Sequence, residues 1–193
     1  MGIEFELKYR ADTGILQQLL QDIYGQEQRY EMQTTYYDTS SRSFSEKKCT
    51  LRRRLENDRS ICTLKTPAAG HGRREWEVEC QRIEDAIEML CKLGAPQDIL
   101  AEAENGLIPI CGAKFTRIAK TIRLEDGCVE LALDQGILTG GDRQIPLCEV
   151  EIELKEGNQA LCLAYANHIA AIYHLTPEPL SKFRRALDLC KGE

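Results

Sequence analysis

The strongest constraint on the fold of this chain is an alternation of charged and apolar residues that recurs in segment after segment. It begins in GIEFELK, where Glu4, Glu6 and Lys8 alternate with apolar residues. Successive side chains of a β-strand point to opposite faces, so this segment predicts a strand with one apolar and one charged face. A single strand of this kind would most simply lie on a surface with its charges in water. The repetition of the pattern raises a second explanation.

Eight segments read as strands, by alternation or by β-rich composition. They lie near residues 2–9, 32–38, 49–55, 60–66, 74–81, 114–125, 128–135 and 147–155. Helical spacing predicts helices over 13–24, 84–93, 97–105 and 158–174, and a short helix after Pro179. Asp126-Gly127 and Gly140-Gly141-Asp142 predict turns between the late strands. The strands dominate and look mostly antiparallel, so we expect one α+β domain over 1–193, with the C-terminal helices of 158–190 included.

The charged face differs in sign from strand to strand. In the first, fifth, seventh and eighth predicted strands it is mainly acidic, with Glu4, Glu6, Glu75, Glu77, Asp134, Glu149, Glu151 and Glu153. In the third, fourth and sixth it is basic, with Arg52, Arg54, Lys65, Arg117 and Arg123. The match is imperfect, because Arg53 falls on the apolar side of its strand.

Two architectures satisfy this pattern. One is an open antiparallel sheet with a solvated outer face, which is common. The other is a barrel whose charges point inward and whose apolar face packs outward under helices, the reverse of the usual small barrel. Solvated faces usually mix Thr, Ser and Gln with their charges, whereas this face is almost entirely Glu, Asp, Arg and Lys. The alternation by itself leaves both architectures open.

A clustered charged face has a chemical consequence. Carboxylates crowded together raise one another's pKa unless a positive group lies between them. A divalent cation such as Mg²⁺ or Mn²⁺ relieves that repulsion through hard oxygen ligands. The opposing Arg and Lys side chains would bind an anion, because Arg suits bidentate phosphate contacts and Lys supplies a point charge. A metal-bridged ligand with several phosphates would satisfy both halves of such a cavity.

Composition excludes several classes of protein. The net charge of −6 over 193 residues argues against a general nucleic-acid binder. No apolar run reaches the ~18–20 residues of a membrane span. The first residues show no basic start followed by an apolar block, so we expect no signal peptide. The nine cysteines are scattered and, like the histidines, lack zinc-ligand spacing. We therefore expect reduced thiols and a cytoplasmic location.

Motifs along nearly the whole chain resemble those of the CYTH superfamily, also called triphosphate tunnel metalloenzymes. EFELK is similar to the family's E-x-E-x-K signature. Further matches follow in order: TTYYDT at 34–39, LRRR at 51–54, TLK at 63–65, RREWE at 73–77, ELALDQG at 130–136, CEVEIELKEG at 148–157 and LSKFRRAL at 180–187. The resemblance implies an eight-stranded antiparallel barrel that forms a hydrophilic, charge-lined tunnel, with an apolar exterior packed by helices.

The resemblance also implies roles for individual residues. It implies the catalytic groups Glu4, Glu6 and Lys8. It implies Mg²⁺ or Mn²⁺ held by Glu4, Glu6, Glu149, Glu151 and Glu153, with Asp134, Glu75 and Glu77 as further candidates. It implies a substrate cradle of Lys8, Arg52, Arg54, Lys65, Arg117, Lys182 and Arg185. Many members carry another basic residue at the position of Ala119, for which Lys120 or Arg123 could substitute. Because Arg184 is adjacent to Arg185, the sequence does not decide which of the two lines the tunnel.

The activity that the resemblance implies is metal-dependent hydrolysis of a linear triphosphate, as in bacterial inorganic triphosphatases, with tripolyphosphate cleaved to pyrophosphate and phosphate. A class IV adenylyl cyclase or a thiamine triphosphatase on the same fold remains an alternative. A non-catalytic polyphosphate-binding module is another, although it would not need the metal glutamates that this chain retains. The expected partner is a small-molecule triphosphate, with no nucleic acid and no membrane. The helix over 158–174 could also offer one face to a second copy, so a homodimer stays open.

Overall fold

The computed structural model describes the backbone of residues 2–68 and 73–191, with side chains from Phe5 onward in those ranges. In this part of the chain ten strands form one antiparallel sheet. They are β1 (Gly2–Glu4), β2 (Glu6–Arg10), β3 (Gln26–Asp38), β4 (Thr50–Glu56), β5 (Arg59–Pro67), β6 (Arg73–Glu79), β7 (Ile108–Leu124), β8 (Gly127–Gly140), β9 (Arg143–Glu156) and β10 (Thr176–Pro177). The helices are α1 (Thr13–Asp22), α2 (Ser43–Glu46), α3 (Ile83–Lys92), α4 (Gln97–Leu100), the 3₁₀ helix η1 (Ala101–Asn105), α5 (Gln159–Ile172) and α6 (Lys182–Leu189).

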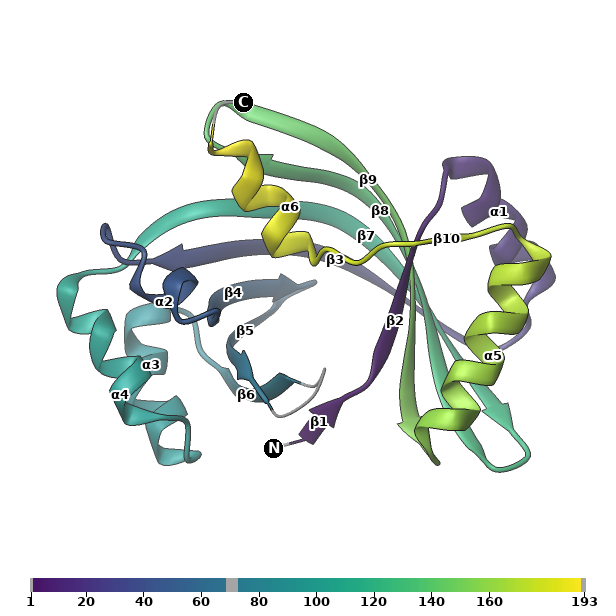
Figure 1. The fold of residues 1–193 in the computed structure, drawn as a ribbon, viewed down its shortest axis with the longest axis horizontal. Coiled ribbons are helices and arrows are strands. Elements are labelled where there is room, and N and C mark those ends of the chain that lie inside the picture. The colour runs from purple at the N-terminus through teal and green to yellow at the C-terminus, as the bar shows by residue number, and fades with distance from the viewer. Residues whose placement is uncertain (1, 69–72, 192–193) are drawn as a thin grey trace.

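The N-terminal segment joins the two halves of a strongly curved sheet (Figure 1). The strand order is β1-β6-β5-β4-β3-β7-β8-β9-β2-β10. β1 and β2 are separated only by Phe5, yet β1 pairs with β6 and β2 pairs with β9. The ladder of hydrogen bonds is not closed into a ring, but the chain itself completes a barrel-like tunnel. The α+β class and the tunnel architecture are thus confirmed, and the predicted strand over 2–9 is two strands with a break at Phe5.

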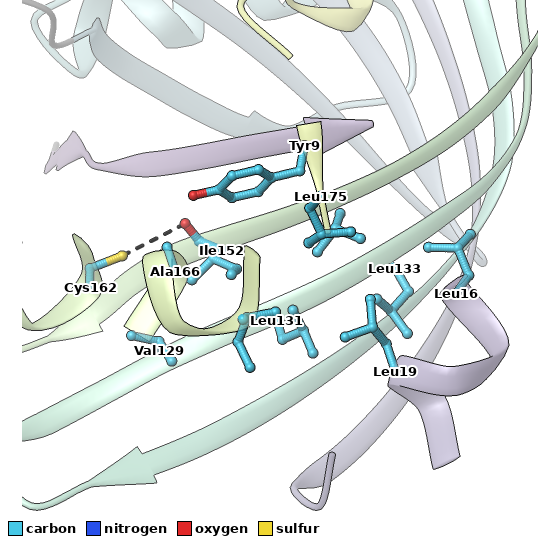
Figure 2. Packing of buried hydrophobic residues seen from close by; sticks show 12 residues of the cluster. Tyr9, Leu16, Leu19, Val129, Leu131, Leu133, Ile152, Cys162, Ala166 and Leu175 are labelled. Carbon is cyan, nitrogen blue, oxygen red and sulfur yellow. Dashed lines mark hydrogen bonds between the residues drawn. The ribbon is translucent and has the colours of Figure 1, made fainter. Parts of the chain in front are cut away.

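The outward-facing apolar side chains pack under helices, as the alternation predicts. One cluster lies between β2, β8 and β9 and the helices α1 and α5 (Figure 2), and it includes the fully buried Leu19, Leu131 and Ile152. A second cluster packs Leu64 of β5 against Leu90 of α3 and its neighbours. Burying a side chain of this size contributes about 1.5–3 kcal/mol. These helices keep the apolar face of the sheet out of water, so the charged face is left to form the interior.

The inward-facing side of the long strands has two zones. Its middle part is charged, but toward one end the same face becomes apolar, with Phe115 of β7, Leu138 of β8 and Leu147 of β9. Ala186 and Leu187 of α6 pack against this apolar zone, and α6 lies on the concave side of the sheet (Figure 1). The sequence alternation does not reveal this apolar end, which exists because β7, β8 and β9 extend past their charged segments and pack against α6.

Two further findings concern the predictions about membrane spans and about the cysteines. No described helix is long and apolar enough to cross a membrane. All nine cysteines lie in described segments, and each is a thiol rather than half of a disulfide.

Lys120 of β7 holds the end of α1 instead of joining the interior. Its ammonium donates to the carbonyl oxygens of Leu20 (2.5 Å) and Ile23 (2.7 Å), and the residue is only 5% exposed. The last carbonyls of a helix need such partners, and hydrogen bonds to charged groups contribute about 1.5–3 kcal/mol. We expect Lys120→Met to lower the free energy of unfolding in urea by about 2–3 kcal/mol, with the stem still packed. A loss below about 0.5 kcal/mol would contradict this function of Lys120.

Candidate active-site tunnel

The cavity inside the curved sheet has a volume of about 330 Å³ and is lined mainly by charged side chains. It brings together these predicted site residues: Glu6, Lys8, Arg52, Arg54, Lys65, Arg117, Glu151, Glu153 and Lys182. The lining also contains residues that the sequence did not single out, among them Tyr36, Thr50, Arg73, Ser181 and Phe183. The sequence could have indicated Thr50 and Arg73. Each lies two residues before a predicted inward-facing residue, Arg52 or Glu75, and therefore on the same face of its strand.

One wall of the cavity, formed by β4 and β5, is basic. Arg52 lies 3.5 Å and Lys65 3.2 Å from carboxylate oxygens of Glu75. Arg54 donates to the hydroxyl of Thr34 at 3.3 Å. Burial, and then the nearby guanidinium groups of Arg52 and Arg117, lower the pKa of Arg54 from its ordinary value. A cation in this environment gains from an anion placed beside it, so the wall is suited to phosphate oxygens.

A second wall, formed by β2 and β9, is acidic. Glu6 lies directly opposite Glu153 on the neighbouring strand, and Lys8 lies opposite Glu151. Opposed carboxylates on one face destabilise a sheet unless positive charge lies near them. Lys8, 3.2 Å from Glu6, and Lys155, 2.7 Å from Glu153, supply part of that charge.

We call Glu6 and Glu153 the acidic row. Both line the cavity, and their side chains are 27% and 24% exposed. Carboxylate oxygens are the hard ligands that Mg²⁺ and Mn²⁺ prefer. The acidic row therefore fits a divalent metal that would face the basic wall.

Three carboxylates lie together at the base of α6. Asp134, Glu149 and Glu151, which we call the acid cluster, each place one oxygen within 4.8 Å of the others. The Lys182 ammonium lies 2.8 Å from Asp134 and 2.7 Å from Glu151, and it also contacts Glu149. Arg117 donates two hydrogen bonds of 2.7 Å to Asp134 and contacts Glu151. The cluster is thus neutralised by side chains of the protein itself.

Burial and charge act on the pKa values of these groups in opposite directions. Burial alone would lower the pKa of Lys182, but the three carboxylates outweigh it and raise that pKa. Burial would raise the pKa of Glu151, yet Lys182 and Arg117 hold it well below the usual range. Burial raises the pKa of Glu149 to about 7. Lys182 and Glu151 are therefore charged at neutral pH and attract each other strongly.

Of the two adjacent arginines near the C-terminus, Arg185 points toward the acid cluster, although it is not among the described residues that line the cavity. Arg185 donates to Glu149 and lies 3.6 Å from Glu178, and its side chain is 15% exposed. Arg184 is exposed and pairs with Asp188 on the outer side of α6. Two residues in one helix turn point in different directions, so only the packing of α6 distinguishes them.

Other predicted residues lie apart from the cavity. Arg123 is exposed opposite Cys128, one residue before the end of β7. It has the right alternation, but it lies at the hairpin beyond the charged interior, and its assignment to the substrate cradle is corrected here. Glu77 accepts from Thr63 at 2.9 Å and is half-exposed. Glu4 belongs to β1, opposite Arg73, and its side chain lies outside the described residues.

This chain is similar to known proteins in sequence and in structure. The CYTH domain model matches residues 2–187. A curated relative, the inorganic triphosphatase of Haemophilus influenzae, is 30% identical over 128 residues, which are 64% of this chain and 36% of that protein. The chain thus matches only about a third of the length of this relative.

Solved structures support the fold. The PH1819 protein of Pyrococcus horikoshii superposes with a TM-score of 0.64 at 21% identity, covering 96% of this chain and 99% of that one. The adenylyl cyclase candidate HpAC1 of Hippeastrum, described with a dominant triphosphatase activity, superposes with a TM-score of 0.66 at 14% identity, covering 97% and 96%. Since the family model covers nearly every residue of the described fold, the chain belongs to the CYTH domain family.

Proposed function

We propose that this protein is a divalent-metal-dependent hydrolase of linear triphosphates and that inorganic tripolyphosphate is its substrate. The observation that carries the proposal is the division of one cavity into a basic wall and an acidic row. A linear triphosphate needs cations along its length, and a metal bridging its oxygens needs carboxylates. The cavity offers both within about 330 Å³.

The residues of the chain would act mainly by position and charge. Arg52, Arg54 and Lys65 would bind phosphate oxygens and orient the chain of phosphates. Glu6 and Glu153 would hold the metal, whose chemistry when bound is to neutralise charge that develops on the phosphoryl oxygens. Hydrolysis forms a bond from water oxygen to a terminal phosphorus and breaks the bridging P–O bond. Pyrophosphate and orthophosphate are the products.

Two further observations support an inorganic substrate. The H. influenzae relative is an inorganic triphosphatase. A nucleotide or thiamine triphosphate would need a surface for its ring, and the aromatic groups at the cavity pack on each other. Tyr36 is 3% exposed and its ring centre lies 5.0 Å from that of Phe183. The acidic row argues against a pure binding module, because anion binding alone gains nothing from carboxylates.

The test offers the purified chain tripolyphosphate, ATP and thiamine triphosphate, each with Mg²⁺, with Mn²⁺ and with EDTA, and follows products by ³¹P NMR. We expect pyrophosphate and orthophosphate in equal amounts from tripolyphosphate, and no turnover with EDTA. Cyclic AMP from ATP would replace the proposal with a cyclase. Faster cleavage of thiamine triphosphate would change the substrate, and binding without turnover would favour a polyphosphate-binding module.

A further inference from the structure

We propose that Phe183 of α6 is a specificity-determining residue. Its ring, packed on Tyr36, closes the α6 side of the cavity to the ring of a nucleotide or of thiamine triphosphate and leaves room for a bare chain of phosphates. This inference rests on the proposed function. To the charged groups that would hold phosphates it adds an apolar group that selects among triphosphates.

The two rings lie at the border of the basic wall. Tyr36 of β3 lies directly opposite Arg52 of β4, and the Cβ atoms of directly opposed residues are about 4.5–5.5 Å apart on one face of a sheet. Phe183 reaches Tyr36 from α6, with the ring centres 5.0 Å apart and the ring planes tilted by 48°. Both residues line the cavity. The rings therefore lie beside the place where a phosphate bound to Arg52 would lie.

The contacts of α6 hold Phe183 in this position. The preceding residue, Lys182, donates to Glu151 at 2.7 Å, deep in the interior. One turn further on, α6 packs so closely on β8 that a Cβ atom added at Gly140 would overlap the carbonyl oxygen of Ala186. Separating a buried ion pair is costly, so the helix does not withdraw the ring to admit a larger ligand.

Tyr36 supports the ring of Phe183 from the opposite side. It is 3% exposed and belongs to the apolar cluster that contains Phe115 and Leu138. Protein interiors are close-packed, so this side chain has little space into which it could move. Phe183 is half-buried, and it contributes to the lining of the cavity. The pair thus forms a fixed apolar boundary of an otherwise mainly charged cavity.

The size and polarity of the cavity give this boundary its effect on specificity. Its volume of about 330 Å³ lies at the low end of the roughly 300–1,000 Å³ of small-molecule pockets. A nucleotide adds a sugar and a base to its phosphates, and burying charged side chains against an apolar base is unfavourable. The aromatic faces of Phe183 and Tyr36 would be the favourable surface for a base, but they pack on each other.

Exclusion and stacking predict opposite effects of a shorter side chain at position 183. If the ring excludes a base, a shorter side chain opens space, and a nucleotide binds more tightly relative to tripolyphosphate. If the ring were a stacking surface for a base, its removal would weaken nucleotide binding, because bases gain from aromatic stacking. The closed packing of the two rings favours exclusion.

The test measures dissociation constants by isothermal titration calorimetry for two ligands whose P–N–P bridges resist hydrolysis, imidotriphosphate and adenylyl imidodiphosphate, at one Mg²⁺ concentration. The proteins are the natural chain, Phe183→Ala, Phe183→Leu and the control Tyr24→Ala, which removes an aromatic side chain that is 89% exposed. The quantity compared is the dissociation constant of adenylyl imidodiphosphate divided by that of imidotriphosphate. Both ligands carry phosphates, so a general change in phosphate binding cancels in this ratio.

We expect the ratio to fall about tenfold in Phe183→Ala, to fall by a smaller factor in Phe183→Leu, and to stay unchanged in Tyr24→Ala. The natural ratio also reflects the different charges of the two ligands, so the change between variants decides. An unchanged ratio in Phe183→Ala would overturn the inference, and a higher ratio would identify Phe183 as a stacking surface instead.

If Phe183→Ala does not fold, the direction of the change in Phe183→Leu decides, because leucine keeps an apolar side chain but removes the ring. No turnover is needed for this measurement. Failure of the natural protein to bind imidotriphosphate would count against the proposed function itself. Binding of imidotriphosphate with a ratio that does not respond to position 183 would overturn only the role of Phe183.

Discussion

Replacing Glu6 with Gln is expected to lower kcat/KM for tripolyphosphate by about 10²–10³-fold while the protein stays folded. Glutamine keeps the shape of the side chain but removes the charge that the acidic row offers to a metal. Glu6 is partly exposed at 27% and its contact with Lys8 is 3.2 Å long, so its contribution to folding is small. Initial rates of phosphate release, with far-UV circular dichroism and urea unfolding, measure both parts of this expectation.

The matched control is Glu31→Gln. Glu31 is also a strand glutamate, but it is 63% exposed and pairs with Arg29 and Thr116 away from the cavity. It should keep the activity of the natural protein. Full phosphate release by the Glu6 variant, or an equal loss in both variants, would remove the acidic row from the chemistry.

Replacing Arg117 with Met is expected to lower the free energy of unfolding by about 3–5 kcal/mol. Arg117 is 13% exposed and neutralises the fully buried Asp134 through two hydrogen bonds of 2.7 Å, besides its contact with Glu151. Removing Arg117 leaves the three carboxylates of the acid cluster with only Lys182 and Arg185 as counter-ions among the described residues. The cost of this uncompensated buried charge exceeds the net stabilisation that the ion pair gives. Urea unfolding at pH 7, followed by tryptophan fluorescence, gives the free energy.

Arg59→Met is the control for this measurement. Arg59 pairs with Glu79 at 3.1 Å, but these side chains are 65% and 60% exposed. Pairs in water contribute about 0–1 kcal/mol. Similar losses in the two variants would show that the acid cluster is not the tightly neutralised network described above.

Much of the site could be predicted because side-chain direction in a strand has a period of two. The alternation in ELK and EVEIELK fixed which side chains share a face, and the structure places Glu6, Glu151 and Glu153 along one cavity. The same rule, applied to Arg123, failed. The alternation shows on which face of the strand a side chain lies. It does not show how far along the strand the residue lies from the site.

Other features depend on contacts that the local pattern does not carry. The short helix α2 has no periodicity, and it is held by Asp38, which is buried and accepts from the backbone N–H groups of Phe44 and Ser45. The apolar end of the interior is explained only by the insertion of α6. The partners of Lys182 come from β8 and β9, more than thirty residues away along the chain.

The central claim is that a triphosphate lies against the basic wall with a metal on the acidic row. A crystal structure with Mn²⁺ and imidotriphosphate, whose P–N–P bridges resist hydrolysis, tests it directly. We predict phosphate density beside Arg52, Arg54 and Lys65, and a manganese anomalous peak beside Glu6 and Glu153. An anomalous peak at Asp134 and Glu149, or phosphate density outside the cavity, would contradict the account.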